Sequence, residues 1–241
     1  MMTLYGWGPM FDCPSPSPFV MKSEIQLQML DAAFNRGFAD LEAVSKHKAP
    51  YLRDGDLVVQ DSNFIRAHVE AKTGCSLLDG LDDQQRAASW ALERMAEDHL
   101  VACIVTERWM KDANFNKGPA LFFSGVPEPM RAEVSRQARD GVAATQFGRG
   151  FTRHSEAERM QLAAWDLEAI ASQLAGQDYL FGDHPTAADA SVSAVLISAA
   201  TEFFDTPLSG LVRGHGNLVD YMDRMKARYF AKNLWPVPEM A

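Results

Sequence analysis

Ser17 stands directly before Pro18, and this pair is typical of the first residues of an α-helix. Serine is a favoured N-cap, and proline fits the first helical turn because its missing N–H is not needed there. The unpaired backbone amides of a helix start attract anions and stabilise a thiolate that lies over them. The segment therefore predicts a site for an anion or a thiolate.

Two further segments are candidates for the same site. Asp61 and Ser62 stand at the start of a second predicted helix, so a carboxylate and another set of unpaired amides lie there. Between the two helix starts, Pro50 sits just before a predicted short strand.

The composition agrees with a soluble globular enzyme of one or two domains. The chain has 241 residues, 47% hydrophobic and 23% charged, which is enough for a sizeable core. A net charge of −9 argues against a nucleic-acid partner, which requires clustered Lys and Arg. The three cysteines are widely spaced and odd in number, which favours a reducing, cytoplasmic location over a disulfide framework. We expect no metal, because the histidines lack metal-ligand spacing, and no membrane span or secretory signal.

The order of predicted elements changes along the chain. The first part shows a strand at 3–7, a helix at 18–34, a weak strand at 38–41, a hairpin through Asp54-Gly55 and a helix at 62–72. From Asp82 onward the pattern is almost entirely helical. The first long helix there carries an apolar stripe of Ala91, Met95, Ala102, Val105 and Trp109. We predict an α/β domain over residues 1–78 and an all-helical domain over 82–241.

Four segments resemble motifs of the glutathione transferase superfamily. They are residues 17–22 (Ser-Pro-Phe-Val-Met-Lys), 48–52 (Lys-Ala-Pro-Tyr-Leu), 60–65 (Gln-Asp-Ser-Asn-Phe-Ile) and 179–189, which ends in Thr186-Ala187-Ala188-Asp189. In this order and spacing the match covers nearly the whole chain. It implies a thioredoxin-like N-terminal domain followed by a C-terminal helical bundle. Residues 17–24, 97–100 and 107–109 are most similar to the branch that contains metaxins and failed-axon-connections proteins.

The resemblance implies a role for each matching residue. Ser17 would hold the thiolate of glutathione, and the backbone of Ala49, before a cis Pro50, would pair with the cysteinyl part of the tripeptide. Lys48 would meet the glycyl carboxylate. Asp61 and Ser62 would bind the γ-glutamyl end, and Thr186 and Asp189 would form a structural capping box. Arg108 and Trp109 are candidates for the electrophile pocket.

Two other side chains compete with Ser17 for the sulfur. Tyr5 lies where some transferase classes place a tyrosine, although a mid-strand position favours packing. Cys13 lies in Cys13-Pro14-Ser15-Pro16 and could form a mixed disulfide with glutathione, which would make the protein a thiol transferase.

The resemblance implies a homodimeric enzyme that conjugates glutathione, as substrate, to a small apolar electrophile. Two alternatives remain: a non-catalytic member that uses the fold for binding or interaction, and the thiol transferase that depends on Cys13.

Overall fold

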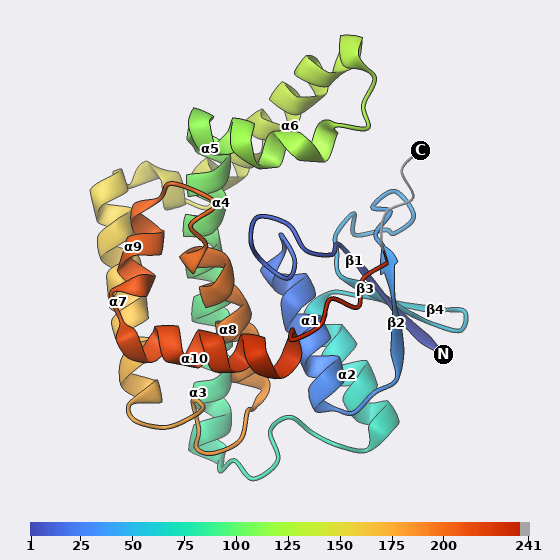
Figure 1. Cartoon of the computed structure of the whole chain (residues 1–241), viewed down its shortest axis with the longest axis vertical. Coiled ribbons are helices and arrows are strands. Elements are labelled where there is room, and N and C mark those ends of the chain that lie inside the picture. The colour runs from blue at the N-terminus through green and yellow to red at the C-terminus, as the bar shows by residue number, and fades with distance from the viewer. Residues whose placement is uncertain (237–241) are drawn as a thin grey trace.

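A computed structural model describes residues 1–236 of the chain (Figure 1). A four-stranded sheet lies on one side of the molecule and a large group of helices on the other, with α1 and α2 between them. The strands are β1 (Met2–Gly6), β2 (Phe34–Phe38), β3 (Tyr51–Asp54) and β4 (Leu57–Gln60), in the order β2-β1-β3-β4. β1 is parallel to β2, whereas β3 is antiparallel to both of its neighbours.

Local signals explain the two helices beside the sheet. α1 (Pro18–Met29) begins after Ser17, and α2 (Ser62–Thr73) begins after Asp61 and ends at Gly74. Gly74 has φ +74°, a left-handed conformation that glycine adopts without strain and that commonly ends a helix. The β3–β4 hairpin turns through Gly55, as its Asp-Gly pair predicts.

The predicted boundaries between residues 29 and 41 are wrong. The first helix ends at Met29 rather than near Phe34, and the second strand is Phe34–Phe38 rather than 38–41. Phe34 pairs with Met2 and Phe38 with Gly6, so the parallel ladder with β1 determines where the strand lies. Gly37 lies inside this strand, where an added Cβ would approach within 2.8 Å of the Tyr5 ring.

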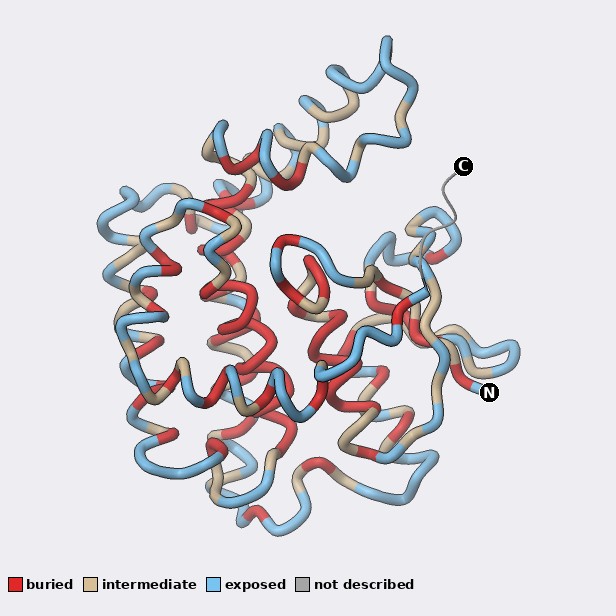
Figure 2. Tube along the Cα trace, viewed as in Figure 1, coloured by how far each residue is buried: buried red, intermediate tan, exposed pale blue. Residues whose placement is uncertain are grey.

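The remaining helices form the second group. They are α3 (Asp83–Arg94), the π-helical turn η1 (Met95–Leu100), α4 (Val101–Met110), α5 (Asp112–Lys117), η2 (Pro119–Phe123), α6 (Glu128–Gly148), η3 (Phe151–Arg153), α7 (Glu156–Leu174), α8 (Ala187–Ala200), α9 (Pro207–Arg213) and α10 (Gly216–Tyr229). Every residue of α8 is buried, and this helix contacts α1, α3, α4, α9 and α10 (Figure 2). It is therefore the centre of the core.

The apolar stripe predicted for the first long helix is only partly correct. Ala91 is exposed, and the buried apolar residues of α4 include Cys103 and Ile104 rather than Val105. Ala91 lies before η1, whereas the shift in α4 follows it, because a π-helical turn holds one more residue than an α-turn and rotates the face that comes after it.

Thr186 and Asp189 form a capping box at the start of α8. One carboxylate oxygen accepts from the backbone N–H and the hydroxyl of Thr186, at 2.7 and 2.8 Å. The other accepts from the Leu180 N–H and the Tyr221 hydroxyl, both at 2.9 Å. Burial raises the pKa of Asp189, and the four hydrogen bonds oppose that rise. The box therefore ties α8 to α10 as well as capping α8.

A buried ionic network joins the sheet side of the molecule to the helices. The Lys22 ammonium of α1, in a residue only 1% exposed, lies 2.6 Å from Glu97 and 3.5 Å from Glu93. It also donates to the Asn63 side chain on α2 at 2.7 Å. Arg66, Arg94 and Ser191 supply further hydrogen bonds to the two carboxylates. One cluster thus connects α1, α2, α3, η1 and α8.

Within residues 1–236, no helix combines the length and apolar character that crossing a membrane requires.

The network makes a stability prediction. Glu97→Gln leaves the buried Lys22 ammonium without its nearest counter-charge and should lower the free energy of unfolding by about 3 kcal/mol. Burial alone would raise the pKa of Glu97, but Lys22, Ser191 and Arg94 hold it below its usual 4.5. Its contribution should therefore be complete above about pH 4.5 and be lost as the pH falls through the lowered value. Urea unfolding from pH 3 to 7 measures both effects.

A matched control is Glu133→Gln, which breaks an exposed ion pair with Arg136 on α6. This variant should unfold much like the wild type, since exposed pairs contribute little. Equal unfolding midpoints for the Glu97 and Glu133 variants would contradict the role of the network.

Candidate active site

The three predicted site segments lie at the same end of the sheet, where β1 and β4 end and β3 begins. Tyr5, near the end of β1, pairs with Tyr51 at the start of β3, and Tyr51 pairs with Gln60 at the end of β4. The loop to Ser17 therefore leaves the sheet where Pro50 enters it and where the chain passes to Asp61.

Ser17 is the N-cap of α1 and is partly buried. Its hydroxyl oxygen accepts from the Val20 N–H at 3.4 Å, and its own N–H donates to the Ser15 hydroxyl at 3.3 Å. The first turn of α1 contains no acidic residue, so nothing there opposes an anion. Because a hydroxyl has one donor hydrogen besides its acceptor lone pairs, the cap leaves that hydrogen available. Capping and donation to a sulfur are therefore compatible.

Asp61 has a strained backbone. Its φ is +91°, which is uncommon for a residue other than glycine, and such strain is concentrated at functional sites. One carboxylate oxygen accepts from the Asn63 N–H at 2.9 Å, which caps α2 and fixes the direction of the side chain. Ser62 follows at the first position of the helix and is buried.

The third segment precedes β3. The Ala49–Pro50 peptide bond is cis, as the resemblance implies. Lys48 beside it is exposed. The preceding residues are held against β4, because the Gln60 side chain accepts from the Lys46 N–H at 2.8 Å and donates to the Ser45 hydroxyl at 3.0 Å. Lys48 thus lies at the rim of the site on a supported loop.

The loop between β1 and Ser17 inserts into the helical group. Met10 and Cys13 form a tight backbone bridge around Phe11 and Asp12, both of which have positive φ. Phe11 is buried among Phe122, Phe203 and Phe204, with ring centroids 5.0 to 5.7 Å apart. The Thr201 hydroxyl donates to the Phe11 carbonyl at 2.8 Å. The Arg108 guanidinium of α4 lies 5.9 Å from the centroid of the Phe11 ring, so the tip of the loop also packs near that helix.

Arg108 is buried beneath this loop. Its guanidinium donates to the Pro16 carbonyl at 3.2 Å and to the Ser198 carbonyl and hydroxyl at 2.6 and 2.9 Å. Burial lowers the pKa of Arg108 to about 10. Trp109 is half-buried and packs against Phe115, Phe122 and Phe123. Arg108 therefore supports the residue next to Ser17, and the cavity that its side chain lines measures only about 10 Å³.

The two competitors of Ser17 occupy packed positions. The Tyr5 ring stacks on Tyr51 with centroids 4.7 Å apart. Cys13 is 4% exposed, and its thiol donates to the Ile197 carbonyl. Burial raises the pKa of Cys13, which disfavours the thiolate that thiol transfer requires.

Three supporting residues were not predicted from the sequence. Lys22 and Asn63 join the helix starts that follow Ser17 and Asp61, and Gln60 holds the loop that carries Lys48. All three lie inside segments that matched known motifs, but an isolated Lys, Asn or Gln gives no signal of the partner that it will contact. Among residues 1–236, no group of three or more His, Cys, Asp and Glu has a metal-binding arrangement.

Two family models match the chain. One, described as the glutathione S-transferase N-terminal domain, covers residues 18–114, and the other, the C-terminal domain, covers residues 163–225. The first match begins directly after Ser17.

Curated relatives agree with these models. The isoprene-epoxide–glutathione S-transferase of Rhodococcus sp. (strain AD45) is 31% identical, over 95% of this chain and 99% of its own. Human metaxin-2 is 26% identical, over 76% of this chain and 70% of its own. The Drosophila melanogaster failed axon connections protein is 24% identical, over 90% of this chain and 55% of its own.

Solved structures share the fold. The β-etherase of Sphingobium sp. strain SYK-6 has a TM-score of 0.63 at 20% identity, over 94% of this chain and 95% of its own. A glutathione S-transferase of Methylobacterium radiotolerans, in complex with glutathione sulfonate, has a TM-score of 0.61 at 19% identity, over 100% of this chain and 97% of its own. With both family models matched and a relative above 30% identity over nearly the full length, the chain belongs to the glutathione S-transferase family.

Proposed function

We propose that this protein binds glutathione and activates its thiol for attack on a small apolar electrophile, with Ser17 stabilising the thiolate. The observation that carries the proposal is the arrangement at the sheet edge. There the N-cap hydroxyl of Ser17, the cis Ala49–Pro50 bond and the strained Asp61 leave or enter the sheet at adjoining strands. The family membership and the isoprene-epoxide relative support the same activity.

The chemistry follows from the helix start. Little glutathione is thiolate at neutral pH, and the thiolate is the nucleophile. The donor hydrogen of Ser17 and the free amides of α1 stabilise the negative sulfur, which lowers the pKa of the bound thiol. With an epoxide as the test electrophile, the sulfur forms a bond to a ring carbon, the carbon–oxygen bond breaks and the alkoxide takes a proton from water.

The other contacts orient the tripeptide. Asp61 has a carboxylate oxygen beyond the one that caps α2, and this oxygen accepts from the γ-glutamyl ammonium. The Ser62 hydroxyl and the amides of α2 bind the γ-glutamyl carboxylate. Lys48 meets the glycyl carboxylate, and the Ala49 backbone pairs with the cysteinyl residue. We further propose a homodimer in the cytoplasm, and light scattering should give twice the mass of one chain.

Binding of glutathione is the first test. Asp61→Asn keeps a side-chain oxygen for the cap, because asparagine is also a good N-cap that tolerates positive φ, but it removes the charge. Calorimetry should show glutathione affinity reduced at least about tenfold, since the ammonium loses a charge-assisted hydrogen bond. Asp82→Asn, at the cap of α3, is the matched control and should bind as the wild type does. Absence of binding heat for the wild type at millimolar glutathione would support the non-catalytic alternative.

The role of Ser17 is the second test. Ser17→Ala should raise the pKa of the bound thiol, read from thiolate absorbance against pH, and should lower the conjugation rate about a hundredfold. Glutathione affinity should change much less, because its carboxylate and ammonium contacts remain. Ser17→Thr keeps the hydroxyl and should restore part of the rate.

Two controls separate this role from capping and from thiol transfer. Ser155→Ala removes the equivalent N-cap from α7 at a similar cost of about 1 kcal/mol, and should leave the rate unchanged. Cys13→Ser should also conjugate normally. Loss of activity in Cys13→Ser, with Ser17→Ala active, would replace the serine mechanism by thiol transfer.

A further inference from the structure

The segment after α10 returns to the sheet side of the molecule. Residues 230–236, which we call the C-terminal strap, run from the end of α10 across α1 toward β1 (Figure 1). At Tyr229 the backbone carbonyl accepts from the Gln28 side chain of α1 at 3.2 Å, which holds the start of the strap against α1. The strap thus connects the last helix to the part of the fold that carries Ser17.

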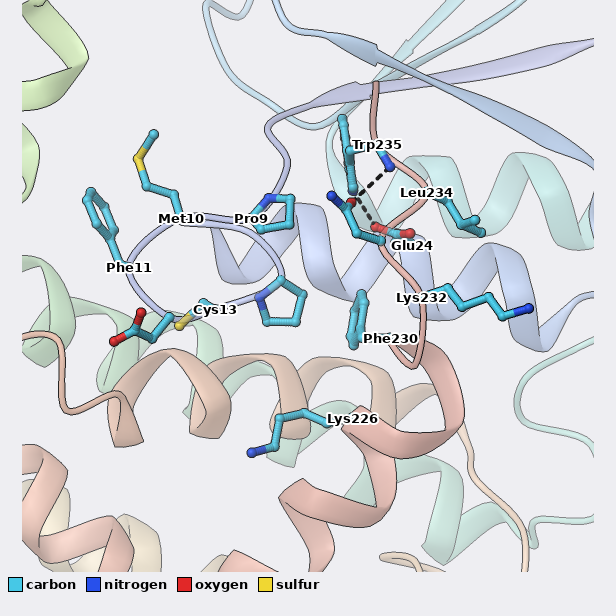
Figure 3. Close-up of a pocket in the computed structure, with 13 residues that line it drawn as sticks. Pro9, Met10, Phe11, Cys13, Glu24, Lys226, Phe230, Lys232, Leu234 and Trp235 are labelled. Carbon is cyan, nitrogen blue, oxygen red and sulfur yellow. Dashed lines mark hydrogen bonds between the residues drawn. The ribbon is translucent and has the colours of Figure 1, made fainter. Parts of the chain in front are cut away.

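Trp235 anchors the strap to α1. The residue is 6% exposed, and its indole N–H donates to Glu24 at 2.9 Å (Figure 3). Glu24 is itself buried, and its other oxygen accepts from Arg36 on β2 at 2.6 Å. The carboxylate therefore has a charged partner on β2 and a neutral donor on the strap. Without the indole, one buried oxygen of Glu24 would lack a partner.

The same indole covers the end of β1. A Cβ added at Gly8 would lie 2.9 Å from the Trp235 Cβ, and one added at Gly6 would lie 3.1 Å from the far edge of the ring. Neither glycine has positive φ, so the closeness of the tryptophan, rather than backbone conformation, requires glycine at Gly8. Trp235 therefore touches the chain where it leaves β1 and bonds to Glu24 in the middle of α1, the helix at whose start the same loop ends.

The loop between these two points has few other supports on this side. A cleft of about 490 Å³ lies between loop residues 9–14, the end of α10 and the strap (Figure 3). On the opposite side the loop is held by the Phe11 cluster and by Arg108 at the Pro16 carbonyl. The indole thus supports the loop from the side opposite to the Phe11 cluster and Arg108.

We infer that Trp235 is a positioning residue for Ser17, and this inference rests on the proposed function. By fixing Gly8 and α1 together, the indole sets the path of residues 9–16 and so the placement of the Ser17 hydroxyl. A donor that stabilises a developing or resting charge must be held within about 0.5 Å of its working position. Loosening the loop should therefore weaken thiolate stabilisation more than glutathione binding, whose carboxylate and ammonium contacts lie on other segments.

Hydrogen exchange tests the structural half of the inference without glutathione. In Trp235→Ala, amides of residues 7–17 should exchange at least tenfold faster, while those of α7 stay unchanged. Trp165→Ala is the matched control, because Trp165 is 62% exposed on α7, and it should leave the loop as in the wild type. Unchanged exchange in residues 7–17 of Trp235→Ala would overturn the inference.

A double-mutant cycle tests the contact itself. Gly8→Ala alone should also accelerate exchange in the loop, because the methyl group displaces the indole. In the Trp235→Ala background the same change should have little further effect, since no ring remains to be displaced. Additive effects of the two substitutions would contradict the proposed contact.

Kinetics test the functional half. Trp235→Ala should raise the pKa of bound glutathione and lower kcat at least tenfold, with the KM for glutathione changed less than threefold. Trp235→Phe, which keeps a ring over Gly8 but lacks the N–H, should recover part of kcat. A loss confined to KM would overturn the positioning role. If the wild type does not bind glutathione, the proposed function fails, while the exchange experiment and the cycle still decide whether Trp235 holds the loop.

Discussion

The buried contact between Lys22 and Glu97 is the constraint on which the arrangement of the molecule depends. An ammonium removed from water is tolerated only when carboxylates and hydrogen-bond acceptors surround it. Glu97, Glu93 and Asn63 satisfy that requirement, and they come from three different elements. The charge can therefore be buried only when α1, α2 and the long α3–η1–α4 helix occupy their observed places. Because α1 and α2 also begin at the site, the same contact sets the spacing of its two helix starts.

At the two helix starts, capping and the proposed contacts with glutathione use different parts of the same side chains. At Ser17 the oxygen caps α1 while the hydrogen is available, and at Asp61 one oxygen caps α2 while the other is available. A residue that caps its helix is held in direction by that bond. The capping hydrogen bond therefore also orients the side chain that would contact glutathione.

Arg108, a candidate for the electrophile pocket, has a guanidinium that bonds to the protein itself. A cation on a helix that borders the site suggests contact with substrate, yet three hydrogen bonds turn this guanidinium toward Pro16 and Ser198. Its partners are neutral, so burial lowers its pKa to about 10. The long β1–α1 loop accounts for this arrangement, since Phe11 at its tip lies beside the Arg108 guanidinium of α4. The loop is thus held from the helical side by Arg108 and Phe11.

What the sequence by itself determined was local. The caps at Ser17 and Asp61 and the Asp54-Gly55 turn rest on bonds between residues a few positions apart, so the residue types reveal them. The overall order of elements follows from hydrophobic periodicity, which is also a local pattern. Only the tertiary structure decided where α1 ends, because β2 takes its register from β1, and how the apolar face shifts after η1. It also decided that Lys22 is buried and that Trp235 lies over Gly8. Those features depend on contacts between residues that are far apart in the chain. The type of a single lysine, glycine or tryptophan does not reveal which distant residue it contacts in the folded protein.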